Sequence, residues 1–150
     1  MVEIRETTAT SILSEPGIAA LLEEYAAESA IHGLPPPRPH ADIYAALDAT
    51  GALTALGAYR DGVLVGFLLF VTTVSPHYSV LLSVCESFFV AAEHRRAGAG
   101  LDLLRAAEER ARERGAVGLL VSSPLGGRLA DVLPRSGYRE TNRAFFKGLA

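Results

Sequence analysis

The sequence predicts one α/β domain built around a mixed sheet, and three observations lead to this fold class. Apolar runs and helical periodicities follow the order strand, helix, helix, three strands, helix, strand, helix, strand. An Asp-Gly pair between two apolar runs is typical of an antiparallel hairpin. Later, a strand, a helix and a strand follow one another, which favours a parallel crossover. The length of 150 residues fits one domain with its own core.

The first part of the chain predicts one strand and two helices. We expect the strand over Val2–Thr7 and a helix that Ser14 caps and that continues to Ala30. Four prolines within Leu34–His40 exclude both a helix and a central strand, so this segment is a loop. A second helix follows over Ala41–Leu47.

The middle of the chain predicts three strands. The runs Ala52–Tyr59 and Val63–Thr73 are joined by the turn Arg60-Asp61-Gly62. A second turn at Ser75–Tyr78 leads into a third strand over Val80–Val90. These three strands form the antiparallel part of the predicted sheet.

The last part of the chain completes the sheet. A helix over Leu101–Gly115 has one apolar face, and Gly115 suits its C-terminal end. We expect a buried strand over Ala116–Val121, a short helix over Leu125–Leu133, and one or two strands within Tyr138–Leu149.

Composition excludes several classes of function. A net charge of −3 and a pI of about 5.8 give no basic surface for nucleic acid. The single Cys85 has no partner for a disulfide or a CxxC metal site. The N-terminal residues lack the apolar region of a signal peptide, and no apolar run is long enough to span a membrane. We therefore expect a soluble cytoplasmic protein without nucleic-acid or membrane partners.

The stretch EHRRAGAG, Glu93–Gly100, connects the third strand of the hairpin region to the following helix. A helix N-terminus exposes unpaired N–H groups and the positive end of the helix dipole. Glycines allow close approach of a phosphate, and Arg95 and Arg96 add positive charge. The stretch predicts a pyrophosphate site; a tight turn alone is the other interpretation.

From Val90 to Leu104 the chain reads VAAEHRRAGAGLDLL, which resembles the motif V-x-x-x-x-[QR]-x-x-G-x-[GA]-x-x-L-L of the GCN5-related N-acetyltransferase (GNAT) superfamily. The element order and the late Gly137-Tyr138 pair fit the same family. The resemblance implies a single acyl-CoA N-acyltransferase domain over residues 1–150. It also implies a central mixed sheet of about six to seven strands, about four flanking helices, and two central parallel strands that splay apart.

The resemblance also implies acetyl-CoA as co-substrate and no metal. Phe88, Phe89 and Val90 would pair with the pantetheine arm through their backbone, and the Val90 N–H would face the acetyl carbonyl as an oxyanion donor. Backbone N–H groups would bind the pyrophosphate. These belong to Arg95, Arg96, Ala97, Gly98, Ala99, Gly100 and Leu101.

Glu86 is the candidate general base. It stands in the alternating row of Val80–Val90 that is otherwise apolar, so burial of that face would raise its pKa toward neutrality. Many members of the family carry an acidic residue at this position. A carboxylate at a bulge or strand edge that faces water is the alternative.

The general acid is less well defined by the sequence. Many members of the family have a tyrosine four residues before the Gly-Tyr pair, where this chain has Leu133. Tyr138 and Ser123 are the alternative acids. The family's asparagine after the fifth strand is also absent, and Ser123 is the candidate cofactor contact in its place.

The predicted function is acetyl-CoA-dependent transfer of an acetyl group to a primary amine of a small molecule or peptide, by direct attack in a ternary complex. A non-catalytic acyl-CoA-binding or regulatory domain, a longer acyl group, and transfer to a hydroxyl are the alternatives. The acidic face Glu23, Glu24 and Glu28 is either a solvated surface or attracts a cationic amine. Final strands such as RAFFKGL predict a homodimer.

Overall fold

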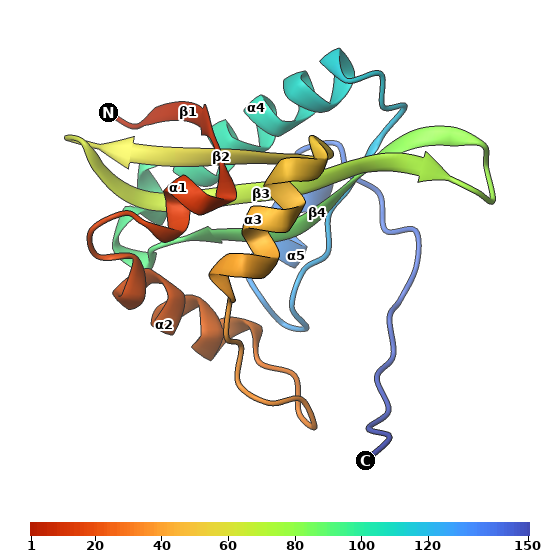
Figure 1. Ribbon diagram of the computed structural model, residues 1–150, viewed down its shortest axis with the longest axis horizontal. Helices are drawn as coiled ribbons and strands as arrows, with labels where there is room; N and C mark the ends of the chain where they lie inside the picture. Colours follow the sequence, from red (N-terminus) through yellow and green to blue (C-terminus); the bar gives the residue numbers. More distant parts are fainter.

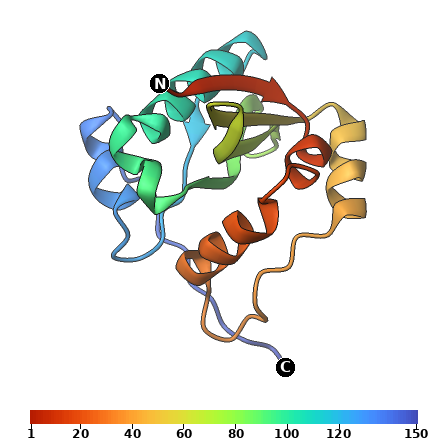
Figure 2. The same ribbon diagram turned by 90° about the vertical axis from the view of Figure 1, so that its left-hand side faces the viewer.

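A computed structural model describes all residues from Met1 to Ala150 as a five-stranded sheet with helices on both faces (Figures 1 and 2). The strands are β1 (Glu3–Thr7), β2 (Leu53–Arg60), β3 (Val63–Ser75), β4 (Val80–Val90) and β5 (Leu119–Leu120). The helices are α1 (Ala9–Leu13), α2 (Ile18–Ser29), α3 (Ala41–Thr50), the 3₁₀-helix η1 (Ala92–Ala97), α4 (Ala99–Glu113) and α5 (Leu129–Arg135).

The strands lie in sequence order, β1-β2-β3-β4-β5. The first four pair antiparallel and β5 pairs parallel with β4, which confirms the predicted mixed sheet with a late crossover through α4. The predicted hairpin turn is also confirmed, because Asp61 and Gly62 both adopt the positive φ angles of a tight hairpin turn.

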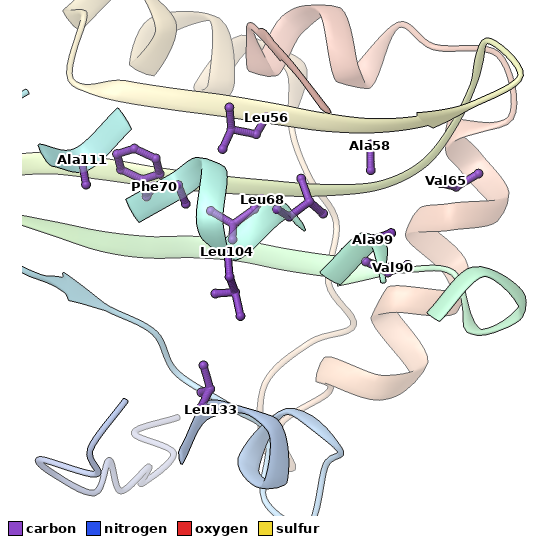
Figure 3. Packing of buried hydrophobic residues seen from close by; sticks show 12 residues of the cluster. Leu56, Ala58, Val65, Leu68, Phe70, Val90, Ala99, Leu104, Ala111 and Leu133 are labelled. Carbon is purple, nitrogen blue, oxygen red and sulfur yellow. The ribbon is translucent and has the colours of Figure 1, made fainter. Parts of the chain in front are cut away.

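Two apolar clusters lie on opposite faces of the sheet. One cluster joins the sheet to α4 and α5 through side chains such as Leu68, Phe70 and Leu104, which Figure 3 shows. The other cluster joins the sheet to α1 and α2, and includes Ile12 and Phe67. Because both faces are covered, β2 and the first half of β3 are almost continuously buried.

The start of the chain differs from the prediction. Ser14 does not cap the long helix; it ends the separate short helix α1, and its hydroxyl donates to the Thr10 carbonyl. The N-cap of α1 is Thr8, whose hydroxyl accepts from the Ser11 N–H. The chain then turns at Gly17, whose φ of 80° requires glycine, before α2 begins.

The end of the chain also differs. The predicted strand over Ala116–Val121 shrinks to the two residues of β5, and Tyr138–Leu149 forms no strand. Such a short β5 offers no edge for further pairing, and backbone hydrogen bonds end at the Tyr138 N–H. The last residues run away from the sheet (Figure 1). The sheet therefore has five strands instead of six to seven, and the homodimer stays a prediction.

The end of β4 near Val90 has an open edge. β5 pairs with β4 only at Ser83 and Val84, so the last six residues of β4 have no strand beside them on that side. The two parallel strands thus separate where β4 approaches α4, as the family resemblance implied. No strand takes up the main-chain groups along this edge; two of them meet side chains instead, the Phe88 N–H with Tyr25 and the Val90 carbonyl with Arg95.

None of the helices combines the length and the apolar character that crossing a membrane requires.

Asp48 fixes α3 against α1 and so sets the position of the helix that reaches the site. Its carboxylate accepts from the N–H groups of Ala9 and Thr10 and from the Thr10 hydroxyl, at 2.7 to 3.0 Å. Partial burial raises the pKa of Asp48, but the hydrogen bonds lower it more, so the net pKa is below the ordinary value.

We expect Asp48→Asn to lower the free energy of unfolding at pH 7 by about 1 kcal/mol, because an amide cannot serve all three donors as a charged acceptor does. A lowered folded pKa gives stability above the unfolded pKa that is lost as the pH falls through the folded pKa. Urea unfolding at pH 7 and pH 3 should therefore show a smaller difference from wild type at pH 3. An equal difference at both pH values would contradict this role.

Candidate active site

The open edge of β4 presents backbone donors in a regular pattern. The Ala91 N–H donates to the Val65 carbonyl of β3, whereas the Phe88 N–H points to the other side, toward the Tyr25 hydroxyl at 3.4 Å. Alternation along the strand places the Val90 N–H on the same open side as that of Phe88. An extended ligand lying along this edge would meet both donors.

The chain turns directly from this edge into α4. After β4, η1 ends at Gly98, which has a φ of 83° and is the N-cap of α4. No side chain caps this helix, so the first N–H groups of α4 have no side-chain acceptor. Uncapped N–H groups at the positive end of a 15-residue helix make a candidate anion site.

The two glycines of the motif serve different purposes. Gly98 is required by its left-handed backbone. Gly100 has no such requirement, and a Cβ there would meet nothing closer than 3.9 Å, at Phe88. Because no packing inside the protein explains Gly100, the space beside it suits the close approach of a ligand phosphate. The residues of this turn therefore fit a pyrophosphate.

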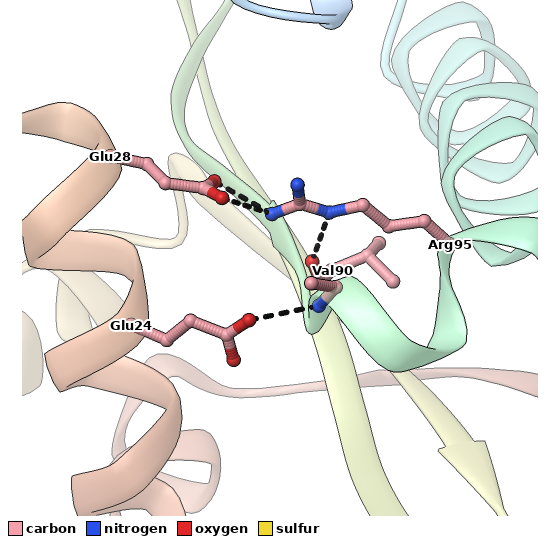
Figure 4. Close-up of polar contacts among 5 residues, drawn as sticks. Glu24, Glu28, Val90 and Arg95 are labelled. Carbon is pink, nitrogen blue, oxygen red and sulfur yellow. Dashed lines mark hydrogen bonds and ion pairs between the residues drawn. The ribbon is translucent and has the colours of Figure 1, made fainter.

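Arg95 does not point toward this anion site. Its Nε donates to the Val90 carbonyl at 2.8 Å, and its Nη2 donates to the two carboxylate oxygens of Glu28 at 2.8 and 2.6 Å (Figure 4). On the same helix, Glu24 accepts from the Ala92 N–H at 2.9 Å. The acidic face of α2 is thus neither a plain solvated surface nor free to attract an amine at these two positions.

The contacts between α2 and the turn give Arg95 and Arg96 different roles. The side chain of Arg95 holds the turn in place through Nε and Nη2, and only its Nη1 group has no partner inside the protein. Arg96 is exposed and takes part in none of the ion pairs. Arg96 is therefore the side chain of the pair that is free to meet a ligand.

We expect Glu28→Gln to weaken acetyl-CoA binding about two- to fivefold, which corresponds to the loss of one partly exposed ion pair. The reason is that the turn loses its attachment to α2. Calorimetric titration gives the dissociation constant, with Glu23→Gln, an exposed position on the same helix, as the matched control. Tighter binding by Glu28→Gln would contradict the holding role, because it would mean that a released Arg95 binds the phosphate itself.

Glu86 lies at a β-bulge, which corrects the expectation of a buried carboxylate. Leu69 pairs with Ser87 and Phe70 pairs with Cys85, so Glu86 is the extra residue of β4. The bulge breaks the strict alternation on which the buried row depended, and Glu86 is exposed. A carboxylate at a bulge that faces water was the alternative prediction for Glu86, and the structure has this arrangement.

Two hydroxyl groups hold the Glu86 carboxylate. The Tyr44 hydroxyl of α3 donates to Oε1 at 2.6 Å, and the Ser87 hydroxyl donates to Oε2 at 2.6 Å. Burial, followed by this bond to a carboxylate, raises the pKa of Tyr44 above its usual range. Tyr44 therefore remains a protonated donor at neutral pH and orients the carboxylate.

Tyr25 of α2 also reaches the end of β4. Its ring stacks on Phe89 with centroids 5.1 Å apart, and its hydroxyl faces the Phe88 N–H. Burial raises the pKa of Tyr25. The helical periodicity of the sequence placed Tyr25 only on an apolar helix face, and no sequence pattern singled out Tyr44. A tyrosine on an apolar helix face brings a hydroxyl into buried surroundings, and this signal would have marked Tyr25 as a candidate.

Glu86 opens into a cleft of about 420 Å³ between α2, α3 and the proline loop. We call it the α2–α3 cleft. Its lining comprises Leu22, Tyr25, Ala26, Ser29, Pro37, Arg38, Pro39, His40, Ile43, Tyr44, Leu47, Glu86 and Ser87. The proline loop thus contributes to the site, as the resemblance implied. The open edge of β4 and the cleft meet at Glu86 and Ser87.

The other candidate residues lie apart from this junction. The Tyr138 hydroxyl donates to Glu108 of α4 at 3.0 Å, and burial followed by this bond raises the pKa of Tyr138. Leu133 is buried in the core cluster on the α4 side. Ser123 is exposed in the loop after β5.

Cys85 lies beside Glu86 but is a poor nucleophile. Burial, and then the neighbouring Glu86, raise the pKa of the Cys85 thiol to about 12, so the thiolate is scarce at neutral pH. No cluster of three or more His, Cys, Asp or Glu side chains is arranged to hold a metal ion.

The open edge of β4, the uncapped glycine turn and the α2–α3 cleft lie together around the end of β4. The profile of the Acetyltransferase (GNAT) family matches residues 18–125, which is more than half of the chain. This chain belongs to that family and is an N-acetyltransferase. The family uses acetyl-CoA. None of the curated proteins matches the sequence.

Solved structures share the fold at low sequence identity. A ribosomal-protein-alanine N-acetyltransferase from Brucella melitensis biovar Abortus 2308 is 23% identical, with a TM-score of 0.72, over 98% of this chain and 97% of that one. An aminoglycoside acetyltransferase from an uncultured soil metagenomic sample, in complex with sisomicin, is 16% identical, with a TM-score of 0.77, over 99% and 97%. A Trypanosoma brucei acetyltransferase is 18% identical, with a TM-score of 0.71, over 99% and 100%. At these identities the likeness concerns the fold.

Proposed function

We propose that this protein transfers the acetyl group of acetyl-CoA to a primary amine by direct attack in a ternary complex, with Glu86 as the general base. The observation that carries the proposal is the junction at the bulge of β4. There the Glu86 carboxylate, in the α2–α3 cleft, lies next to the open strand edge. An amine in the cleft and a thioester along the edge would meet at this point.

The binding residues follow from the same geometry. The N–H groups of Phe88 and Val90 lie on the open side of β4 and would receive the pantetheine arm and the acetyl carbonyl. The backbone from Arg95 to Leu101, with the exposed Arg96, would hold the pyrophosphate. Ser123 stays a proposed contact of the cofactor after β5.

Each group in the proposed reaction has a defined task. Glu86, directly or through one water, takes a proton from the ammonium form of the acceptor so that the free amine can attack. The Val90 N–H stabilises the oxygen that becomes negative as the C–N bond forms. The nitrogen then loses its second proton to solvent, and the C–S bond breaks to leave the amide and the thiolate of CoA. The thiolate of CoA takes a proton from solvent.

No side chain is assigned as general acid in this path. The Tyr138 hydroxyl already donates to Glu108, and its raised pKa makes proton donation to a thiolate unfavourable. Leu133, buried in the core, occupies the position where the sequence pattern of the family has a tyrosine. A solvent-protonated leaving thiolate fits both observations.

The proposal is tested by incubating the protein with acetyl-CoA and a panel of amines, and by measuring free thiol together with the mass of the product. The panel contains simple alkylamines, amino acids, aminoglycosides and peptides with free N-termini. Amine-dependent thiol release and a product heavier by one acetyl group are expected. Acetyl-CoA binding without any acetylated product would favour the non-catalytic acyl-CoA-binding domain instead.

A further inference from the structure

The α2–α3 cleft carries one charge of each sign. Glu86 is the only carboxylate in its lining, and Arg38 is the only guanidinium. Glu86 belongs to β4, and Arg38 belongs to the proline loop that joins α2 to α3. The cleft therefore has an acidic group on the sheet side and a basic group on the loop side.

The Arg38 side chain has no partner inside the protein. It forms no ion pair, and it appears in none of the side-chain hydrogen bonds, in contrast to Arg95, whose Nε and Nη2 both have partners. An arginine that lines a cleft without a partner has all five of its N–H donors available to a ligand.

The backbone on both sides of Arg38 is restricted although its side chain is free. Pro37 and Pro39 flank it, so φ is fixed at both neighbours, and the residue before a proline is confined to extended conformations. The loop thus presents Arg38 to the cleft with little freedom in the main chain. This reduces the entropy that binding a ligand anion there would cost.

The walls between the two charges are largely apolar. Leu22 and Leu47 line the cleft from α2 and α3. Ile43 of α3 also lines it, and its side chain is 62% exposed, which is high for an isoleucine beside a candidate site. An apolar ligand body would cover this side chain and remove it from water.

We infer that the acceptor is an amino acid in the chemical sense, with a primary amine and a carboxylate joined by an apolar skeleton. The amine lies toward Glu86, the carboxylate binds Arg38, and the apolar part contacts Ile43. This assignment rests on the proposed function, because Glu86 marks the reacting end of the cleft. It makes Arg38 a specificity-determining residue.

A polycationic acceptor fits this cleft poorly. An aminoglycoside carries several ammonium groups, whereas the lining offers a single carboxylate and also contains a guanidinium. Every additional ammonium would face Arg38 without a counter-charge. The cleft therefore differs in charge from what such a polyamine requires, although a solved aminoglycoside acetyltransferase shares the fold.

The test compares acids with their uncharged amides as acceptors. The probes are leucine, methionine, phenylalanine and a series of ω-amino acids, each paired with the amide that keeps the amine and removes the carboxylate. Values of kcat/KM are measured with acetyl-CoA for wild type, Arg38→Gln and Arg38→Lys. Arg60→Gln is the matched control, because Arg60 is exposed, forms no ion pair and does not line the cleft.

We expect wild type to prefer at least one acid over its amide by about tenfold or more, the value of a charge-assisted hydrogen bond. Arg38→Gln should reduce this acid-to-amide ratio about tenfold, Arg38→Lys should restore part of it, and Arg60→Gln should leave it unchanged.

Three results would overturn the inference. The first is acetylation of amides or aminoglycosides in preference to every acid. The second is an acid-to-amide ratio that Arg38→Gln does not change. Both leave the proposed function standing, because acetyl transfer still occurs. The third is the absence of product with every amine, which overturns the proposed function and this inference together.

Discussion

Glu86→Gln is expected to lower kcat about 100-fold or more, the usual contribution of a general base. The amide keeps the size of the side chain and can accept from one of the two hydroxyls, Tyr44 or Ser87, through its single oxygen, but it cannot take a proton. The acetyl-CoA dissociation constant should not change, since the cofactor is held by the strand edge and the turn. Steady-state rates and calorimetric titration of the same preparation measure the two quantities.

The pH dependence of the rate distinguishes a general base from a carboxylate that only supports the structure. In wild type the rate should fall on the acidic side as the base is protonated, and this limb should disappear in Glu86→Gln. Tyr44→Phe removes the hydrogen bond that orients the carboxylate, so kcat should fall while the dissociation constant of acetyl-CoA stays unchanged. Glu23→Gln, on the exposed face of α2, is the control for the loss of a surface charge. An acidic limb that persists in Glu86→Gln would assign the base to another residue.

Gly100→Ala is expected to weaken acetyl-CoA binding about 10- to 100-fold, because the added methyl group keeps a phosphate away from charge-assisted backbone donors. The fold should gain stability at the same time. Ala replaces Gly inside the first turn of α4, where a Cβ meets nothing closer than 3.9 Å, so a gain of about 0.5 to 1 kcal/mol is expected. Weaker binding by a more stable protein cannot be explained by misfolding.

Two comparisons assign the effect of Gly100→Ala to the pyrophosphate. Acetyl-pantetheine has the thioester arm without the pyrophosphate, and its affinity should be the same for wild type and variant. Gly148→Ala is the matched control, because a Cβ at Gly148 also has open space but lies near the chain end. An unchanged acetyl-CoA affinity in Gly100→Ala would mean that EHRRAGAG is only a turn.

The sequence predicted those parts of the structure that depend on local chemistry. The Asp61-Gly62 turn, the proline loop and the position of Gly115 after α4 all follow from backbone preferences, and the structure has each of them. The boundaries of β2, β3 and β4 were close to those observed because their apolar runs are long and are bounded by turn residues. The family motif then located the turn into α4.

The predicted strands were wrong where the structure of a segment depends on its pairing partner in the sheet. The strand expected over Ala116–Val121 has suitable apolar residues, yet it pairs with β4 at only two positions, and the predicted strands over Tyr138–Leu149 have no partner at all. A β-strand forms only where a neighbouring strand pairs with it. Apolar composition alone therefore predicted more strands than the sheet has. Short helix α1 was missed because five residues are too few for a periodic pattern.

The candidate site also has features that the sequence predicts and features that only the tertiary structure determines. By itself the sequence determined the glycine turn, the uncapped start of α4 and the presence of a carboxylate near the end of β4, since each lies within one continuous segment. The tertiary structure alone decided that Glu86 sits at a bulge and is exposed, that Tyr44 holds it, and that Glu28 binds Arg95. These contacts join residues 42 and 67 positions apart, and local propensity carries no information about which distant side chains a fold brings together.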